Sequence, residues 1–180
     1  MCLHNAKALI NNESLIYEVI KIKCSHNKII LRAMPKSRKA GDWLSMALED
    51  LDDAHEDYNS GRYASSVFHA ELSAQKAVKA LIAAFGFEAP KTHRPTQVLK
   101  SLISGGLIDL PSQLMEKIGI LLSYATTLED QGTTPRYGWE TVDRIIKPSE
   151  IYSKDIASSL LKNAEKVCEI AREIIGEMDC

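Results

Sequence analysis

The chain has 180 residues, which fits one ordinary domain with an appendage, and its 45% hydrophobic and 26% charged content is typical of a globular protein. No apolar run reaches about 18 residues, so a membrane-spanning helix is not expected. A net charge of -2 argues against a protein that coats nucleic acid by charge alone, although it is compatible with a local basic site.

Residues 1–40 differ in character from the rest of the chain. Residues 15–23 and 28–31 are rich in Ile, Val and Leu and are separated by a polar turn, so they predict a small N-terminal β-hairpin. Residues 35–40 are polar and basic and are expected to form a linker. An isolated hairpin is marginal in water and would have to pack on the bundle or on a partner. The alternative interpretation is that residues 1–33 are an extension without a functional role.

The cysteines give no sign of a metal site or a disulfide framework. Cys2, Cys24, Cys168 and Cys180 are widely spaced and form no CxxC pair. The N-terminus carries polar residues where an export signal needs its apolar centre. We therefore expect a cytoplasmic protein without a membrane segment, a bound metal or a cofactor.

A helical domain is expected over residues 41–180. Asp42 is a candidate cap for the first helix, which ends at Asn59-Ser60-Gly61. Its acidic run is interpreted as a solvated face. The buried stripe is expected to consist of Leu44, Ala47, Leu48, Leu51, Ala54 and Tyr58, and the solvated face of Glu49, Asp50, Asp52, Asp53, Glu56 and Asp57.

The remaining helices follow from apolar periodicity and from proline and glycine breaks. The pattern predicts a second helix over residues 63–85, a third over 96–103 with Pro95 in its first turn, and a fourth that opens at Pro111-Ser112. Gln131–Trp139 is expected to be a loop, and Ser153 to cap the last helix. The inward residues of that helix are expected to be Ile156, Leu160, Ala164, Val167, Ala171 and Ile174.

These elements indicate an all-α fold, an up-and-down bundle of four or five helices with the small N-terminal β-hairpin as an extension. The first two helices are expected to leave apolar surface that would suit a symmetric homodimer.

Short motifs occur in a fixed order along residues 41–177. They are Trp43-Leu44-x-x-Ala47-x-x-Asp50-Leu51, Ser60-Gly61-Arg62-Tyr63, Ala77-Val78-Lys79-Ala80-Leu81, Thr92-His93 and Arg136-Tyr137. In this order they resemble the HEPN family, the higher-eukaryote and prokaryote nucleotide-binding domains, in its stand-alone prokaryotic form. The chain departs from the family pattern at Glu71, Gln75 and Gly138, where the family usually has Gln, Glu and Pro.

Many ribonucleases of the family share an Arg-x(4–6)-His motif at a dimer axis, in which His moves a proton and Arg stabilises charge on the phosphate. Arg62 and His69 form the one literal match in this chain. They lie at the start of the second helix, whereas the family motif lies nearer the C-terminal half. No His follows Arg136 or Arg144. We therefore interpret Arg62 and His69 as weak catalytic candidates.

Two loops combine basic and aromatic residues, which grip phosphate and stack on bases. In an up-and-down bundle the loop after the second helix and the loop before the last helix can lie at one end. We expect a nucleotide or RNA site there, unless the aromatic residues only plug the end of the bundle. Its residues would be Lys91, His93, Arg94, Arg136, Tyr137 and Trp139.

The resemblance implies a dimeric binding and interaction module paired with a separate nucleotidyltransferase in a toxin–antitoxin-type system. The alternative is a metal-independent ribonuclease toxin, an endoribonuclease with a non-standard active site. A third possibility is a nucleotide-binding regulator that uses the end loops. The sequence alone leaves open whether the protein is an enzyme.

Overall fold

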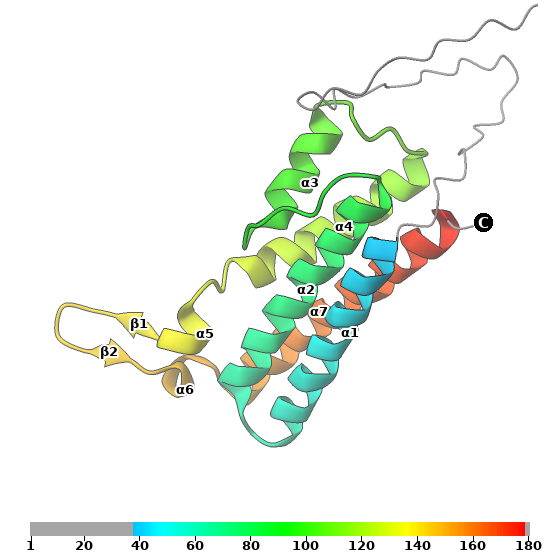
Figure 1. The fold of residues 1–180 in the computed structure, drawn as a ribbon. Coiled ribbons are helices and arrows are strands. Elements are labelled where there is room, and N and C mark those ends of the chain that lie inside the picture. Colours follow the sequence, from blue (N-terminus) through cyan, green and yellow to red (C-terminus); the bar gives the residue numbers. More distant parts are fainter. Residues whose placement is uncertain (1–37, 179–180) are drawn as a thin grey trace, which may run out of the picture.

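A computed structural model describes residues 38–178. The predicted N-terminal hairpin lies outside the described residues. Four long helices form the bundle: α1 (Arg38–Asn59), α2 (Tyr63–Ala84), α4 (Ser112–Glu129) and α7 (Lys154–Met178). The all-α prediction is confirmed, and Figure 1 shows α2 between α1, α7 and α4.

The core lies where the apolar stripes of these helices meet. The central helix α2 is rich in alanine on its buried face, so its neighbours approach closely. The stripe predicted for α7 is confirmed with one exception. Ile156 is 44% exposed, because in the first turn of α7 the neighbouring residue Ala157, which is fully buried, faces the bundle instead. Fully buried side chains include Val67, Val78, Leu81, Leu121, Leu128, Val167 and Ile174.

The start of α1 differs from the prediction. The helix begins at Arg38, so part of the expected linker is helical and Asp42 lies inside the helix rather than at its cap. The predicted turn after Asn59 is confirmed, since Gly61 adopts a φ of 77° that L side chains rarely adopt. The predicted cap of α7 is also confirmed, because Ser153 Oγ accepts a hydrogen bond from the Ile156 amide at 3.4 Å.

The apolar surface expected on the first two helices is partly covered. Among residues 38–178, every large side chain that is both apolar and exposed lies outside α1 and α2. Several apolar side chains of these two helices are only partly buried, including Leu44, Leu48, Leu51, Tyr58 and Tyr63. The predicted homodimer stays a prediction.

The short elements connect the long helices. After α2 the chain runs back along the bundle, so α3 (Pro95–Ser104) begins beside the C-terminal end of α4 (Figure 1). The expected loop after α4 is not wholly irregular. It contains a helical turn, α5 (Thr134–Tyr137), and leads into a hairpin of β1 (Trp139–Glu140) and β2 (Ile145–Ile146). A further short helix, α6 (Pro148–Ile151), precedes α7.

None of the helices in residues 38–178 combines the length and the apolar character that a bilayer crossing requires.

Candidate functional site

A buried carboxylate joins the two weak catalytic candidates. Asp57 near the end of α1 is only 6% exposed. Its Oδ1 accepts a hydrogen bond from Arg62 Nε at 2.7 Å and lies 2.6 Å from Arg62 Nη2. Its Oδ2 lies 3.0 Å from His69 Nδ1, but the geometry of this contact is not that of a hydrogen bond. The turn between α1 and α2 therefore brings Asp57, Arg62 and His69 into one cluster.

This cluster has the elements of an acid–base site. A carboxylate oxygen beside one ring nitrogen of His69 supplies the third group of such a site, although the hydrogen bond that would select a His tautomer is not formed here. The side chain of His69 is 28% exposed and that of Arg62 is 57% exposed, so both are open to a ligand. The structure thus gives the Arg62/His69 match a geometry that its sequence position did not suggest.

The second feature is an arginine held between aromatic rings. The Arg136 guanidinium carbon lies 5.0 Å from the ring centroid of Phe68 and 5.5 Å from that of Tyr137. The Phe68 ring in turn lies 5.2 Å from the His69 ring. Phe68 therefore connects the Asp57 cluster on α2 to the predicted basic residue on α5.

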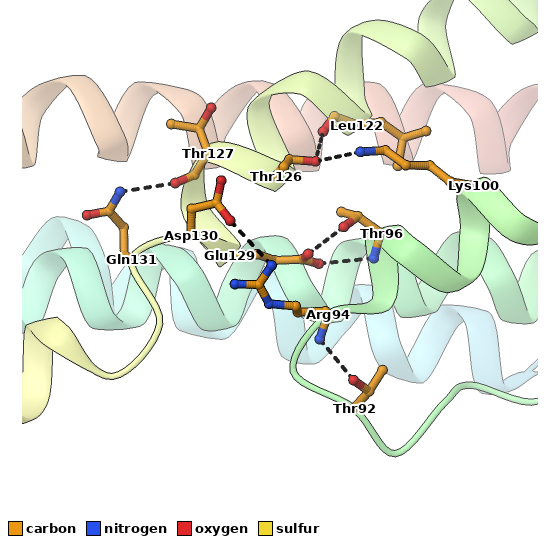
Figure 2. Close-up of polar contacts among 10 residues, drawn as sticks. All are labelled: Thr92, Arg94, Thr96, Lys100, Leu122, Thr126, Thr127, Glu129, Asp130 and Gln131. Carbon is orange, nitrogen blue, oxygen red and sulfur yellow. Dashed lines mark hydrogen bonds and ion pairs between the residues drawn. The ribbon is translucent and has the colours of Figure 1, made fainter.

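Two further carboxylates are buried behind this surface. Glu71 on α2 and Glu129 at the end of α4 are each 3% exposed. Glu71 Oε1 accepts a 2.6 Å hydrogen bond from Gln75 Nε2. Both carboxylate oxygens of Glu129 are held by Thr96, whose amide donates to Oε1 at 3.0 Å and whose hydroxyl donates to Oε2 (Figure 2).

Burial controls the protonation of this pair. Desolvation raises the pKa of Glu71 from 4.5 to about 7, against the opposing effects of the Gln75 hydrogen bond and the Arg136 charge. The negative charge of Glu129 contributes to the same rise. Desolvation also raises the pKa of Glu129, although its hydrogen bonds from Thr96 oppose this. Burial therefore favours the protonated form of both acids.

The surroundings of these two acids are also polar. The Tyr152 hydroxyl donates a 3.2 Å hydrogen bond to Gln131 Oε1, and burial followed by the charge of Glu71 raises the pKa of Tyr152 to about 12. Arg94 Nη1 lies 3.5 Å from Asp130 Oδ1 at the exposed rim (Figure 2).

The predicted loop residues are only partly brought together. Arg94 lies 3.5 Å from Asp130, so the loop after α2 reaches the C-terminal end of α4, directly before the predicted loop over residues 131–139 (Figure 2). It reaches this place because the chain returns along the bundle before α3 begins (Figure 1). Arg136 and Tyr137 form one stack, and Trp139 is 61% exposed in the hairpin. Lys91 and His93 are exposed in the loop before Arg94.

The acidic run of α1 was wrongly interpreted as uniformly solvated. Asp50 and Asp57 are buried, and Asp50 Oδ2 lies 2.6 Å from Lys76 Nζ. The signal was present in the sequence, because positions 47, 50, 54 and 57 follow the three- and four-residue spacing of one helix face. Glu71 and Gln75 gave the same kind of signal, as polar residues one turn apart on an apolar face.

Within residues 38–178, no group of three or more His, Cys, Asp or Glu side chains has the arrangement of a metal site. In the same range Cys168 is a free, buried thiol that contacts Ser73.

The model of the HEPN domain family matches residues 40–174. The chain belongs to the HEPN family. It is 29% identical over 135 residues to MJ1304 of Methanocaldococcus jannaschii, whose name describes it as a candidate toxin; the match covers 75% of this chain and 87% of that protein. The resemblance inferred from the ordered motifs is thereby confirmed.

Solved structures agree with the fold. TT1696 from Thermus thermophilus matches with a TM-score of 0.57 and 26% identity, over 75% of this chain and 97% of that one. ST0689, described as an archaeal HEPN homologue, matches with a TM-score of 0.54 and 24% identity, over 76% of this chain and 97% of that one.

Proposed function

We propose that this HEPN protein is the toxin component of a two-protein toxin–antitoxin system and that it binds RNA at the surface formed by Phe68, Arg136 and Tyr137. It acts as a homodimer and pairs with a separate nucleotidyltransferase. The relationship to MJ1304, named as a candidate toxin, supports the first part of this proposal.

The stacked Arg136 supports the RNA-binding part. Its guanidinium lies against two rings and, among the described residues, takes part in no ion pair, so its N–H donors remain available for a phosphate. Tyr137 is 69% exposed and can stack on an unpaired base, and the predicted Trp139 lies two residues further on. Arg94, His93 and Lys91 would extend the basic surface along the other loop.

RNA binding is tested with a labelled single-stranded oligonucleotide and fluorescence anisotropy. Arg136→Ala should weaken binding about tenfold, equivalent to about 1.4 kcal/mol. Arg136→Lys should recover only part of the loss, because Lys keeps the charge without the planar fork. Arg172→Ala, which removes an exposed arginine on α7, is the matched control. Equal affinity of the Arg136→Ala and Arg172→Ala proteins would rule out this surface.

The partner is tested by co-purification from the native host with mass spectrometry. Recovery of a small nucleotidyltransferase whose co-expression relieves growth arrest is the expected result. Arrest that persists with that enzyme present, or a chain that causes no arrest, would contradict the toxin–antitoxin part of the proposal.

The Asp57 cluster favours one second candidate function, metal-independent RNA cleavage. His69 would take the proton of a 2′-hydroxyl as the 2′-oxygen attacks phosphorus, and Arg62 would stabilise the phosphorane charge. The 5′-oxygen would then leave and take a proton from water. Asp57 would position the imidazole. The products would be a 2′,3′-cyclic phosphate and a 5′-hydroxyl.

Cleavage is tested with purified protein in a chelating buffer. His69→Asn should abolish it, and a substrate with a 2′-deoxy sugar at the cut site should resist it. His93→Asn is the matched control, since His93 is exposed and lies outside the cluster. Undiminished cutting by the His69→Asn protein would eliminate this mechanism and leave RNA binding as the proposed activity.

A further inference from the structure

The exposed large apolar side chains lie outside α1 and α2, the two helices that were expected to carry apolar surface. Seven large apolar residues are exposed in residues 38–178. Four of them lie in residues 137–145, between α4 and α6, while two others lie near α3 and α4. The four are Tyr137, Trp139, Val142 and Ile145, and the two are Leu107 and Ile120.

The hairpin over residues 139–146, here called the β-arm, projects from the bundle (Figure 1). Val142 at its tip is fully exposed and Ile145 is 58% exposed. Two strands without a covering layer are marginal in water, because little apolar surface is removed from solvent. The β-arm therefore gains stability from a surface that covers it.

Side-chain contacts brace the β-arm at its turn and at its base. Its turn is closed by Thr141, whose hydroxyl donates to the Arg144 carbonyl at 2.7 Å and accepts from the Arg144 amide at 3.1 Å. Arg144 Nη1 also lies 2.9 Å from Glu150 Oε2 on α6. At the base, Gly138 has a φ of 74° and a Cβ there would meet the Ile146 carbonyl oxygen at 2.1 Å. A rigid arm loses little conformational entropy on docking.

A groove between α3 and α4, here called the α3–α4 groove, is a surface that could receive the apolar side chains of the β-arm. Its apolar end has a volume of about 190 Å³ and is lined by Ile103, Met115, Ile118 and Leu122. Gly119 also lines the groove, and a Cβ at that position would meet nothing within 4 Å. At Gly119 the groove is thus open to a side chain from outside.

The charges on the β-arm indicate what kind of surface can bind it. Its free charges are the carboxylates of Glu140 and Asp143, since Arg144 is already paired with Glu150. These two acids would repel the phosphates of a nucleic acid from the arm beyond Trp139, whereas the proposed RNA surface lies before it, at Arg136 and Tyr137. The α3–α4 groove carries Lys100 at its rim, and in residues 38–178 the ammonium contacts the Thr126 hydroxyl but no carboxylate. An acidic, apolar arm is complementary to this cationic, apolar groove.

The β-arm cannot fill the groove of its own chain. Figure 1 shows the arm directed away from the bundle, with α5 between it and α3. We propose that the β-arm docks in the α3–α4 groove of a second copy of this chain, whose own arm docks reciprocally. Two such contacts related by a two-fold axis close a dimer and leave no free arm. This inference rests on the proposed function in one respect, because it names the surface through which the proposed homodimer forms.

The dimer is tested by light scattering coupled to gel filtration on the full chain. Val142→Asp changes the arm tip and Gly119→Leu fills the groove. Each should weaken dimerisation at least about tenfold, because each removes the apolar contact from both halves of the interface. The matched controls are Ile156→Asp, which changes an exposed apolar residue outside the arm, and Gly176→Leu, which changes a helical glycine with open space on α7. Both controls should dimerise like the wild type, and circular dichroism should show that all four variants fold.

A mixing experiment distinguishes arm exchange from a general loss of association. The Val142→Asp chain keeps an intact groove, and the Gly119→Leu chain keeps an intact arm. An equimolar mixture therefore retains one of the two contacts and should form heterodimers at concentrations where each variant alone is monomeric. A monomeric wild-type chain, dimeric single variants, or a mixture that stays monomeric would overturn the inference.

The failure of this inference can be separated from that of the proposed function. RNA affinity of the Val142→Asp protein reports on the Arg136 surface, which does not include the arm tip. A Val142→Asp protein that loses the dimer but keeps RNA binding supports arm exchange. If that variant stays dimeric while Arg136→Ala loses RNA binding, arm exchange is overturned and RNA binding is still supported.

Discussion

Two buried acids on the inner helices show how partners determine the state of a carboxyl group. Asp57 is 6% exposed and faces the cationic or ionisable groups of Arg62 and His69. Glu71 is 3% exposed and accepts a hydrogen bond from the neutral amide of Gln75, and the charge of a second acid, Glu129, also acts on it. Burial is similar at the two sites, yet only Glu71 lacks a cation in direct contact. Burial alone therefore does not fix the charge of an acid; the groups that replace water do.

The largest effect on stability is expected from removing Arg62, the cation that pairs with Asp57. Arg62→Ala leaves the buried carboxylate with His69 alone, so we expect a loss of about 2 kcal/mol in the free energy of unfolding at pH 7. Urea denaturation followed by circular dichroism measures it. The double variant Arg62→Ala/Asp57→Asn should regain most of the loss, and an unaffected Arg62→Ala protein would show that Asp57 needs no cation.

Neutralising Glu71 is expected to stabilise the protein at high pH. Its folded-state pKa is about 7 against an ordinary 4.5, so the folded state favours the protonated acid. The stability that Glu71 contributes is therefore fully present below pH 4.5, is lost as the pH rises to about 7 and changes little above it. Glu71→Gln, which still accepts the Gln75 hydrogen bond, should remove this loss and add on the order of 1 kcal/mol at pH 8.

The measurement is the urea midpoint as a function of pH. The wild-type and Glu71→Gln proteins should agree near pH 4.5 and diverge toward pH 8. Equal pH profiles for the two proteins would mean that Glu71 is solvated in the folded state. Glu165→Gln, which changes a half-exposed acid on α7, serves as the control for loss of one negative charge.

Changing the neighbouring acid should produce a smaller effect. The Glu129 charge is the least of the causes that act on Glu71, so Glu129→Gln should move the midpoint of the pH profile to lower pH by less than about one unit. The variant also loses one bond from Thr96, at a cost of about 1 kcal/mol, and it removes the pH dependence that the raised pKa of Glu129 itself contributes. A midpoint that rises would contradict the assigned repulsion.

The exposed ion pair at the rim should contribute least. Arg94 and Asp130 are both more than half exposed and lie 3.5 Å apart, so water competes for each charge. Arg94→Ala should change the free energy of unfolding by no more than about 0.5 kcal/mol. The same urea denaturation measures it, and an effect as large as that of Arg62→Ala would mean that burial does not separate the two arginines.

Much of the fold was predictable, because it depends on local patterns. The bounds of α2, α3 and α4 follow from apolar spacing, prolines and glycines, which act on adjacent residues. The β-arm was not predicted, since its strands are two residues long and its sequence resembles a loop. Its shape depends on Arg144 reaching Glu150 and on the positive φ of Gly138, which the sequence does not display.

The candidate site was predictable only in part. Arg136 and Tyr137 were identified because basic and aromatic residues are adjacent in a loop, and Arg62 and His69 because they match a spacing. Asp57 was missed because it lies within a run of acidic residues, which hides its place on the buried stripe. Phe68 was missed because its role depends on α5, a distant segment of the chain, folding against it.

By itself, the sequence determined the helical bundle and the HEPN family, because helix periodicity and motif order are properties of residues close in the chain. The tertiary structure alone decided which polar residues share a surface and which are buried. Those outcomes depend on the path of the chain after α2 and on the packing of α5 against α2. Both are settled by contacts between distant segments, whose energies no local pattern records.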